Sequence, residues 1–238
     1  MFHVKHCLAG REVFRVSIAY KESFEKYETY VHVIDSLFSK IKDEYGACVN
    51  CKPGCDDCCY ALFDLTLIEA MYINHHFNQR FHGDKKVKLL EKAGVVDRKI
   101  HKLKKSAYQQ LKHGQDEINI LGEMAMERIR CPLLNDNNEC ELYDKRPITC
   151  RLYGIPTSSY GTSHICGKSA FEKGAKYPTI NMEKVYEQLY HFSLELSIQI
   201  KTKYSKLPEM MIPMSMALIT EFNDEYLGVV NAEREKEV

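Results

Sequence analysis

The residues with the clearest capacity for chemistry in this 238-residue chain are its ten cysteines, because nine of them fall into two groups. The first group is Cys48, Cys51, Cys55, Cys58 and Cys59, and the second is Cys131, Cys140, Cys150 and Cys166. The residues between the first five are mostly Asn, Lys, Pro, Gly and Asp, which form turns, and turns allow several sulfurs to converge on one point. Thiolates are preferred ligands of zinc, copper(I) and iron–sulfur clusters. We therefore expect a metal site that draws on both groups.

The spacing of these thiols favours an iron–sulfur cluster over zinc and leaves both open. The first group contains two C-x2-C pairs that only three residues separate, whereas zinc ribbons usually have a longer spacer. A compact run completed by a distant cysteine is typical of cubane clusters, and Cys131-Pro132 matches the Cys-Pro that closes ferredoxin sites. Nine thiols exceed the four that one cubane needs. The candidates are thus one or two clusters, 4Fe-4S first, or Zn²⁺ instead.

Two details of the cysteine set affect how many metals it can hold. Cys58 and Cys59 are adjacent, so their side chains should diverge, and either they serve two metals or one is a spectator. Cys7 is isolated from the others, and we expect it to be an inert buried thiol.

The second group of cysteines lies in a longer motif, Cys140-x-Leu-Tyr-x-x-Arg146-Pro-x-x-Cys150-Arg151. Together with the Cys58-Cys59 pair, this motif resembles the YkgJ-type cysteine-cluster family of zinc- or iron-chelating proteins, over residues 48–166. The resemblance implies metal chelation. A more distant similarity, to the flagellin lysine N-methylase, adds a protein methylase that uses S-adenosylmethionine as a further alternative.

The two arginines of this motif, Arg146 and Arg151, are candidate cofactor-binding residues. Near cluster thiolates they would offset negative charge and donate hydrogen bonds to sulfur, which tunes a redox potential. Alternatively, they are structural: Arg146 would pair with Asp144 or bind backbone carbonyls through the same donors.

Composition narrows the function classes. The chain has 33 Lys plus Arg and 33 Asp plus Glu, so its net charge is zero. This balance does not support electrostatic binding of nucleic acid by the domain as a whole. Residues 1–20 hold no apolar run of secretory length, and no stretch is long and apolar enough to span a membrane. We therefore expect a cytoplasmic protein whose thiols stay reduced. The sequence identifies no redox or protein partner and no oligomeric state.

Hydrophobic periodicity predicts helices on both sides of the cysteines. Apolar residues recur at intervals of four and three from Tyr20 to Tyr45, which predicts one long helix that ends at Gly46. We take this helix as residues 17–46, after a short strand or irregular lead-in at 12–19. Further helices are predicted over 66–78, 84–113, 115–130 and 181–204, the first with a capping box of Thr66 and Glu69. The whole chain, 1–238, is expected to form a single domain around a core at 48–166.

The cysteine-rich centre itself is expected to be irregular. Two short apolar runs, 131–134 and 139–143, flank an Asn-Asp-Asn-Asn turn and predict a hairpin that places Cys131 near Cys140. Residues 144–151 should form a helical turn with Pro147 near its start, and 154–180 an ordered loop over the site. The expected fold class is mainly α, with helices around an irregular metal-binding centre and a small β-hairpin.

These features lead to three functional hypotheses. The first is an iron–sulfur protein for electron transfer or an uncharacterised protein modification. The second is a zinc-stabilised interaction module without catalysis, and the third is the protein lysine methylase. Catalytic residues cannot be assigned from the sequence, so it does not decide whether the protein is an enzyme.

Overall fold

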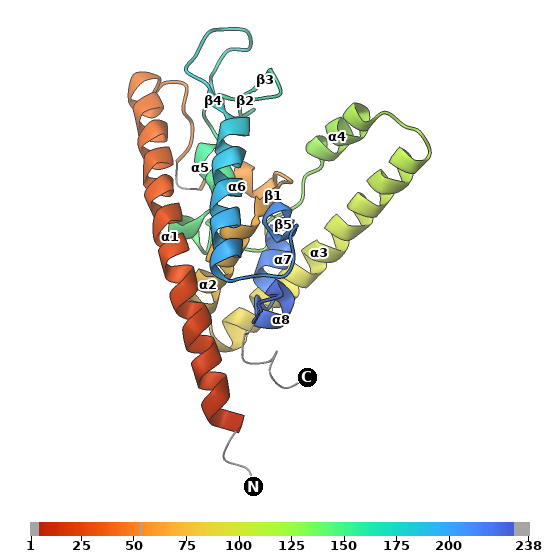
Figure 1. Cartoon of the computed structure of the whole chain (residues 1–238). Helices are drawn as coiled ribbons and strands as arrows, with labels where there is room; N and C mark the ends of the chain where they lie inside the picture. The colour runs from red at the N-terminus through yellow and green to blue at the C-terminus, as the bar shows by residue number, and fades with distance from the viewer. Residues whose placement is uncertain (1–4, 53, 231–238) are drawn as a thin grey trace.

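The computed structural model describes the backbone of residues 5–52 and 54–230, and the side chains of residues 20–52 and 54–230. The fold is mainly helical, as predicted, with two small sheets (Figure 1). The helices are α1 Lys5–Glu44, α2 Leu67–Arg80, α3 Gly83–Lys112, α4 Glu117–Met126, α5 Ile148–Leu152, α6 Met182–Gln199, α7 Met214–Ile219 and α8 Asp224–Leu227. The strands are β1 Asp64–Thr66, β2 Thr157–Ser159, β3 Thr162–His164, β4 Ile180–Asn181 and β5 Met211–Pro213.

Helix α1 is the longest helix, and α6 lies beside its C-terminal part in the antiparallel direction (Figure 1). The predicted apolar stripe of α1 is confirmed at its centre, where Phe24, Tyr27, Val31, Ile34 and Ile41 are buried. The short strand or irregular lead-in expected at 12–19 is wrong, because α1 begins at Lys5. Extending a helix adds one hydrogen bond for each residue fixed, whereas a strand there needs a pairing partner. The side chain of Cys7 lies outside the described residues.

Helix α2 lies between α1, α6 and α7 and is the most deeply buried helix of the core. Its predicted start is confirmed: the Glu69 carboxylate accepts hydrogen bonds from the backbone amide and the hydroxyl of Thr66. The amide of Ile68 donates to the hydroxyl of Ser193 on α6 at 3.2 Å. Helix α6 begins at the Asn181 cap, as predicted, but ends at Gln199 rather than at 204.

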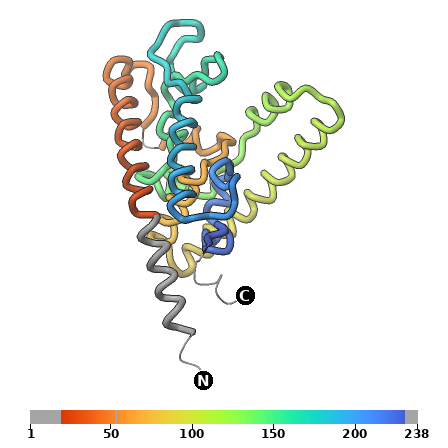
Figure 2. The backbone as a smooth tube through the Cα atoms, in the orientation of Figure 1, coloured from red at the N-terminus to blue at the C-terminus, as the bar shows by residue number. Residues whose placement is uncertain are grey.

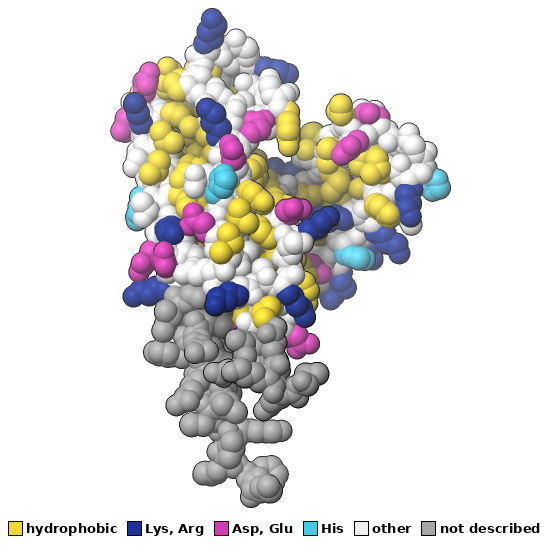
Figure 3. All heavy atoms as spheres, viewed as in Figure 1, with side chains coloured by type: hydrophobic (Ala, Val, Ile, Leu, Met, Phe, Trp, Pro, Cys, Tyr) yellow, Lys and Arg dark blue, Asp and Glu magenta, His cyan; other side chains and the backbone are white. Residues whose placement is uncertain are grey.

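Helices α3 and α4 form an arm that projects from the rest of the molecule (Figure 2). The predicted third helix is confirmed, and Gly94 does not interrupt it. The fourth helix ends at Met126 instead of 130, because residues 128–131 leave it to pair with the cysteine loop. Its expected apolar face is largely in solvent: Ile118 is 78% exposed and Leu121 57%. Apolar side chains are visible on this arm in Figure 3.

The β1–β5 sheet joins segments that are far apart in the chain, whereas the other sheet is built within residues 157–181. Strand β1 pairs antiparallel with β5, with Leu65 opposite Ile212, and so connects the start of α2 to the start of α7. The region 154–180 is more ordered than the predicted loop, because β2 and β3 form a hairpin and β4 pairs parallel with β2. Within the described residues, no helix is long and apolar enough to cross a membrane.

Candidate metal centre

The first cysteine group begins directly after the end of α1. Cys58 and Cys59 lie on a single 3-10 turn, Asp57–Tyr60. The segment that follows α4 runs antiparallel to this turn: Cys131 donates its backbone amide to the carbonyl of Cys59 at 2.7 Å, and Ile129 donates to Tyr60 at 3.0 Å. This pairing brings the second cysteine group to the first across 72 residues of sequence.

The predicted hairpin of residues 131–143 is present. Leu134 and Cys140 form an antiparallel bridge, and the amide of Glu141 donates to the carbonyl of Leu133 at 2.8 Å. The side chain of Asn135 accepts from the amides of Asn137 and Glu139 and closes the turn. The hairpin therefore places Cys131 and Cys140 on one side of the same short element.

Cys150 is positioned by the short helix α5, whose N-terminus is anchored by a buried acid. The Glu69 carboxylate accepts the amide of Ile148, the first residue of α5, at 3.0 Å. Burial raises the pKa of Glu69, an effect that hydrogen bonds from Ile148 and Thr66 partly offset. The sequence identified Glu69 only as the cap of α2, so its second role in holding the turn that carries Cys150 was missed.

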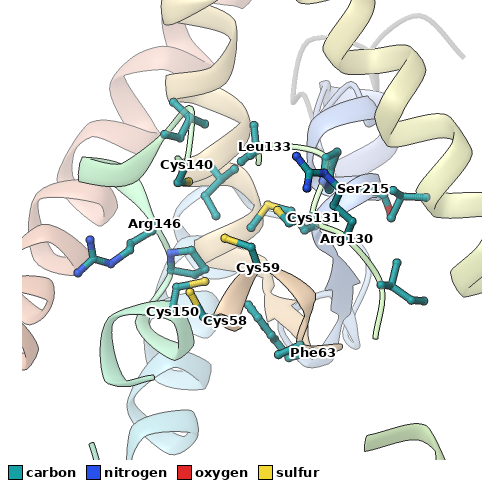
Figure 4. A pocket seen from close by; sticks show the side chains of 18 of the residues that line it. Cys58, Cys59, Phe63, Arg130, Cys131, Leu133, Cys140, Arg146, Cys150 and Ser215 are labelled. Atoms are coloured by element: carbon teal, nitrogen blue, oxygen red, sulfur yellow. The ribbon is translucent and has the colours of Figure 1, made fainter. Parts of the chain in front are cut away.

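Five thiols line one cavity with about 50 Å³ of internal space (Figure 4). We call them the cavity thiols: Cys58, Cys59, Cys131, Cys140 and Cys150. The other walls are mainly apolar and come from the cysteine segments, from α3 and from α7; they include Phe63, Val96, Ile100, Leu133, Leu142 and Met214. Such a wall suits a cofactor held by sulfur, because it excludes water around the ligands.

The cavity thiols interact directly with one another. Cys58 accepts hydrogen bonds from the thiols of Cys150 and Cys59, which lower the pKa of Cys58 to about 3. The same interaction, reinforced by burial, raises the pKa of Cys59 and Cys150. Burial also raises the pKa of Cys131, to about 12. The cluster thus favours one thiolate among several thiols, and a bound cation would allow more of them to ionise.

Three further cysteines lie beside this cavity but do not line it. We call Cys51, Cys55 and Cys166 the outer thiols. Burial, followed by the nearby thiols of Cys55, Cys166 and Cys58, raises the pKa of Cys51 to about 11, so these three lie within electrostatic reach of Cys51. The Cys51 thiol donates to the carbonyl of Tyr153 at 3.3 Å.

Cys48, the remaining cysteine of the first group, contributes to the centre mainly through its backbone. Its carbonyl accepts the amide of Ala170 at 2.9 Å, which fastens the loop of Cys166 to the first group. Its half-buried side chain packs against the hydrophobic core.

The two predicted cofactor-binding arginines have different environments. Arg151 is only 6% exposed and is fully engaged: its guanidinium pairs with Asp35 and donates to the carbonyls of Asp144 and Arg146. Arg146 stacks on the Tyr143 ring at 3.9 Å and extends away from the sulfurs (Figure 4). Its charge nevertheless lowers the pKa of Cys51, Cys58 and Cys140.

The thiols are near one another but not yet arranged around one point. Within residues 20–52 and 54–230, no three Cys, His, Asp or Glu side chains already form a metal-binding group. All nine cysteines described are free thiols, and several of them hydrogen bond to each other or to the backbone. Metal binding therefore requires rotations of cysteine side chains, which the short turns that carry them permit.

Comparison with known families agrees with this geometry. Residues 50–167 match the model of the CxxCxxCC family, described as a "putative zinc- or iron-chelating domain". The chain carries a domain of this family. The CxxCxxCC domain thus contains the cavity thiols and the outer thiols, and it begins after Cys48. No curated protein and no solved structure shows significant similarity to the chain.

The residues present fit an iron–sulfur cluster or zinc. The donor set is thiolate alone, which suits soft or borderline metals. The CxxCxxCC domain therefore has the ligands for metal chelation. Sequence reasoning found every one of these cysteines but missed Gly154, on which the position of the Cys51 sulfur depends. A methyl group on Gly154 would overlap that sulfur, and the φ of +105° there favours glycine.

Proposed function

We propose that this protein holds an iron–sulfur cluster of the 4Fe-4S type in the cavity lined by the five cavity thiols, and that the cluster serves electron transfer. One observation carries the proposal: five thiols from separate segments of the chain line a single cavity whose other walls are mainly apolar. A cubane is held by four cysteine thiolates, which a compact run and distant cysteines supply together, and apolar walls exclude water from it.

The ligands proposed for the cluster are Cys59, Cys131, Cys140 and Cys150. Cys59 and Cys131 come from paired backbone segments, Cys140 from the hairpin and Cys150 from α5. Full cysteine ligation leaves no open coordination position, which favours electron transfer over chemistry on a bound substrate. When bound, the cluster supplies one-electron redox chemistry at a potential that the surrounding charges and hydrogen bonds set.

The protein's own residues would contribute to that potential through the charge of Arg146. The guanidinium favours the ionised form of three cysteines around the site, and a positive charge there also favours the reduced cluster. Because the described cysteines are free thiols, we further place the protein in a reducing compartment, the cytoplasm.

The test is the iron, acid-labile sulfide and zinc content of the full chain purified without oxygen, together with its visible spectrum. We expect a brown protein with about four iron and four sulfide per cluster. A colourless protein with zinc and no sulfide would overturn the redox proposal and support a zinc-stabilised interaction module, which unfolds on chelation.

A further inference from the structure

The outer half of the arm carries apolar side chains that no part of the described chain covers. On α4, Ile118 and Leu121 are largely in solvent, Met126 is 80% exposed, and only Ile120 is buried. On α3, Tyr108 is 58% exposed. Figure 3 shows apolar side chains on this arm. An exposed apolar patch of this kind marks an interaction surface.

The exposed residues of α4 follow the pattern of a helix that packs against another helix. At about 3.6 residues per turn, Ile118, Leu121 and Ala125 lie on one face, and Glu117 and Glu123 border that face on either side. Apolar residues bordered by charged ones are typical of helix–helix interfaces, where the charges select the partner and its orientation. The pattern therefore predicts a helical partner with positive charges at the borders of its own apolar face.

Charges of opposite sign are segregated on the two helices of the arm. Residues 99–113 contain five lysines and no acidic residue, whereas residues 116–127 contain four acidic residues and no Lys or Arg. Within the described residues, Lys104 is the only one of these lysines in an ion pair, with Asp64, and none of the four acids forms one. The arm therefore presents a positive and a negative surface that do not neutralise each other within the chain.

The positive surface of α3 borders an exposed aromatic ring. Lys105 and Lys112 are three and four residues from Tyr108, so the three side chains lie on the same face of α3, and all are exposed. The ammonium group of Lys112 lies 4.8 Å from the centroid of the Tyr108 ring. This face, an apolar ring bordered by lysines, is the counterpart of the apolar face of α4 bordered by glutamates.

A second copy of this chain matches both surfaces of the arm at once. When two arms pack antiparallel about a two-fold axis, α4 of each copy faces α3 of the other, so glutamates meet lysines and the apolar faces meet between them. Two helical hairpins packed in this way form a four-helix bundle. A purely acidic partner would match α3 alone, and a purely basic one α4 alone.

We propose that the chain forms a symmetric dimer through its arms, in which α4 of each copy packs against the outer half of α3 of the other. The proposal goes beyond the metal centre and does not depend on which metal that centre holds. The part of α3 that lines the cavity, at Val96 and Ile100, lies toward the base of the arm and outside the proposed interface. Loss of the dimer should therefore leave the metal content unchanged.

The experiment measures the mass of the full chain in solution by sedimentation velocity across a range of protein concentrations. We expect twice the 27.7 kDa of one chain, with dissociation on dilution. Ile118→Ser together with Leu121→Ser removes apolar contacts twice, because the interface is symmetric, and should raise the Kd of the dimer at least about tenfold. Both side chains are exposed in the single chain, so circular dichroism and metal content should match the wild type.

Charge reversal tests which helices meet. Glu117→Lys with Glu123→Lys gives an α4 that repels α3 of the other copy, and Lys105→Glu with Lys112→Glu makes the opposite change on α3. Each variant alone should therefore sediment as a monomer. Mixing the two variants places opposite charges at both contacts again, and the mixture should recover the wild-type Kd to within about threefold.

Lys88→Glu with Lys92→Glu is the matched control, because it makes the same change in charge at the base of α3, where both lysines are exposed. This variant should sediment as a dimer. A wild-type chain that is monomeric at every concentration would overturn the proposal. So would a dimer that Ile118→Ser with Leu121→Ser leaves intact, or a mixture of the two charge-reversed variants that stays monomeric.

Discussion

The guanidinium of Arg151 lies 2.6 Å from the carboxylate of Asp35, and this ion pair joins the short helix that carries Cys150 to the C-terminal third of α1. The same side chain donates to the carbonyl of Asp144 at 2.6 Å and to that of Arg146 at 2.9 Å. One buried guanidinium therefore connects α1, residues 144–146 and α5. Arg151 directly follows Cys150 in the motif, and its role is therefore to hold the Cys150 thiol in position.

Removal of this guanidinium should destabilise the fold. Arg151→Met leaves two carbonyls and one carboxylate without their donor, and we expect a loss of about 2–4 kcal/mol in the free energy of unfolding. Thermal or urea unfolding followed by circular dichroism measures the change. Lys21→Met is the control, because Lys21 and Glu25 form an exposed pair at 3.9 Å that should contribute nothing measurable. Equal stability of the two variants would contradict the structural role of Arg151.

The buried Glu69 should make stability depend on pH. Its pKa in the folded chain is raised above the ordinary value of 4.5, so its protonated form favours folding. That contribution is fully present below about pH 4.5 and is lost as the pH rises through the folded-state pKa. Each unit of elevation corresponds to about 1.4 kcal/mol. Glu69→Gln cannot ionise, so it should lose less stability than the wild type between pH 4.5 and 7.5.

The measurement is the free energy of unfolding of both proteins across that range, and the informative quantity is the difference between them at each pH. Glutamine keeps one acceptor oxygen, so a constant offset between the curves is expected and does not affect the test. Glu25→Gln, at an exposed position, should follow the wild-type curve. Parallel curves for the wild type and Glu69→Gln would show that Glu69 does not carry the pH dependence.

The elements that local patterns specify were predictable from sequence. The stripe of α1, the capping box of Thr66 and Glu69 and the hairpin at Cys131 each depend on residues within a few turns of one another. The end of α4 and the pairing of β1 with β5 depend on segments that only the folded chain brings together. Periodicity does not report such distant partners.

The candidate site was likewise only partly predictable from the sequence. The residue types and spacing of the cysteines indicated metal chelation, and the family match agrees. The division of the thiols between a cavity and an outer group depends on the loop of Cys166 and on Gly154, which spacing along the chain does not reveal.

The charge of Arg146 should raise the reduction potential of the proposed cluster. Reduction adds negative charge, which a nearby guanidinium stabilises, so Arg146→Gln should lower the potential. For one charge about 14 Å from the cluster, Coulomb's law at an effective dielectric constant of about 20 gives a shift on the order of 50 mV. Anaerobic redox titration measures it. Arg146→Lys keeps the charge and should stay within about half of that shift, whereas an unchanged potential in Arg146→Gln would remove Arg146 from the electrostatics of the site.

Gly154 and Gly161 offer a matched pair for testing how the Cys51 sulfur is held. Both have positive φ, +105° and +76°, so an alanine at either position meets backbone strain of about 1 kcal/mol or more. A methyl group at Gly161 meets no atom within 4 Å, whereas one at Gly154 overlaps the sulfur of Cys51.

Gly154→Ala should therefore cost about 1–2 kcal/mol more than Gly161→Ala, because only its methyl group displaces the sulfur of Cys51. The free energy of unfolding of both variants is the measurement. If both variants lose the same stability, backbone strain alone accounts for the loss and the contact between Cys51 and Gly154 contributes nothing to it.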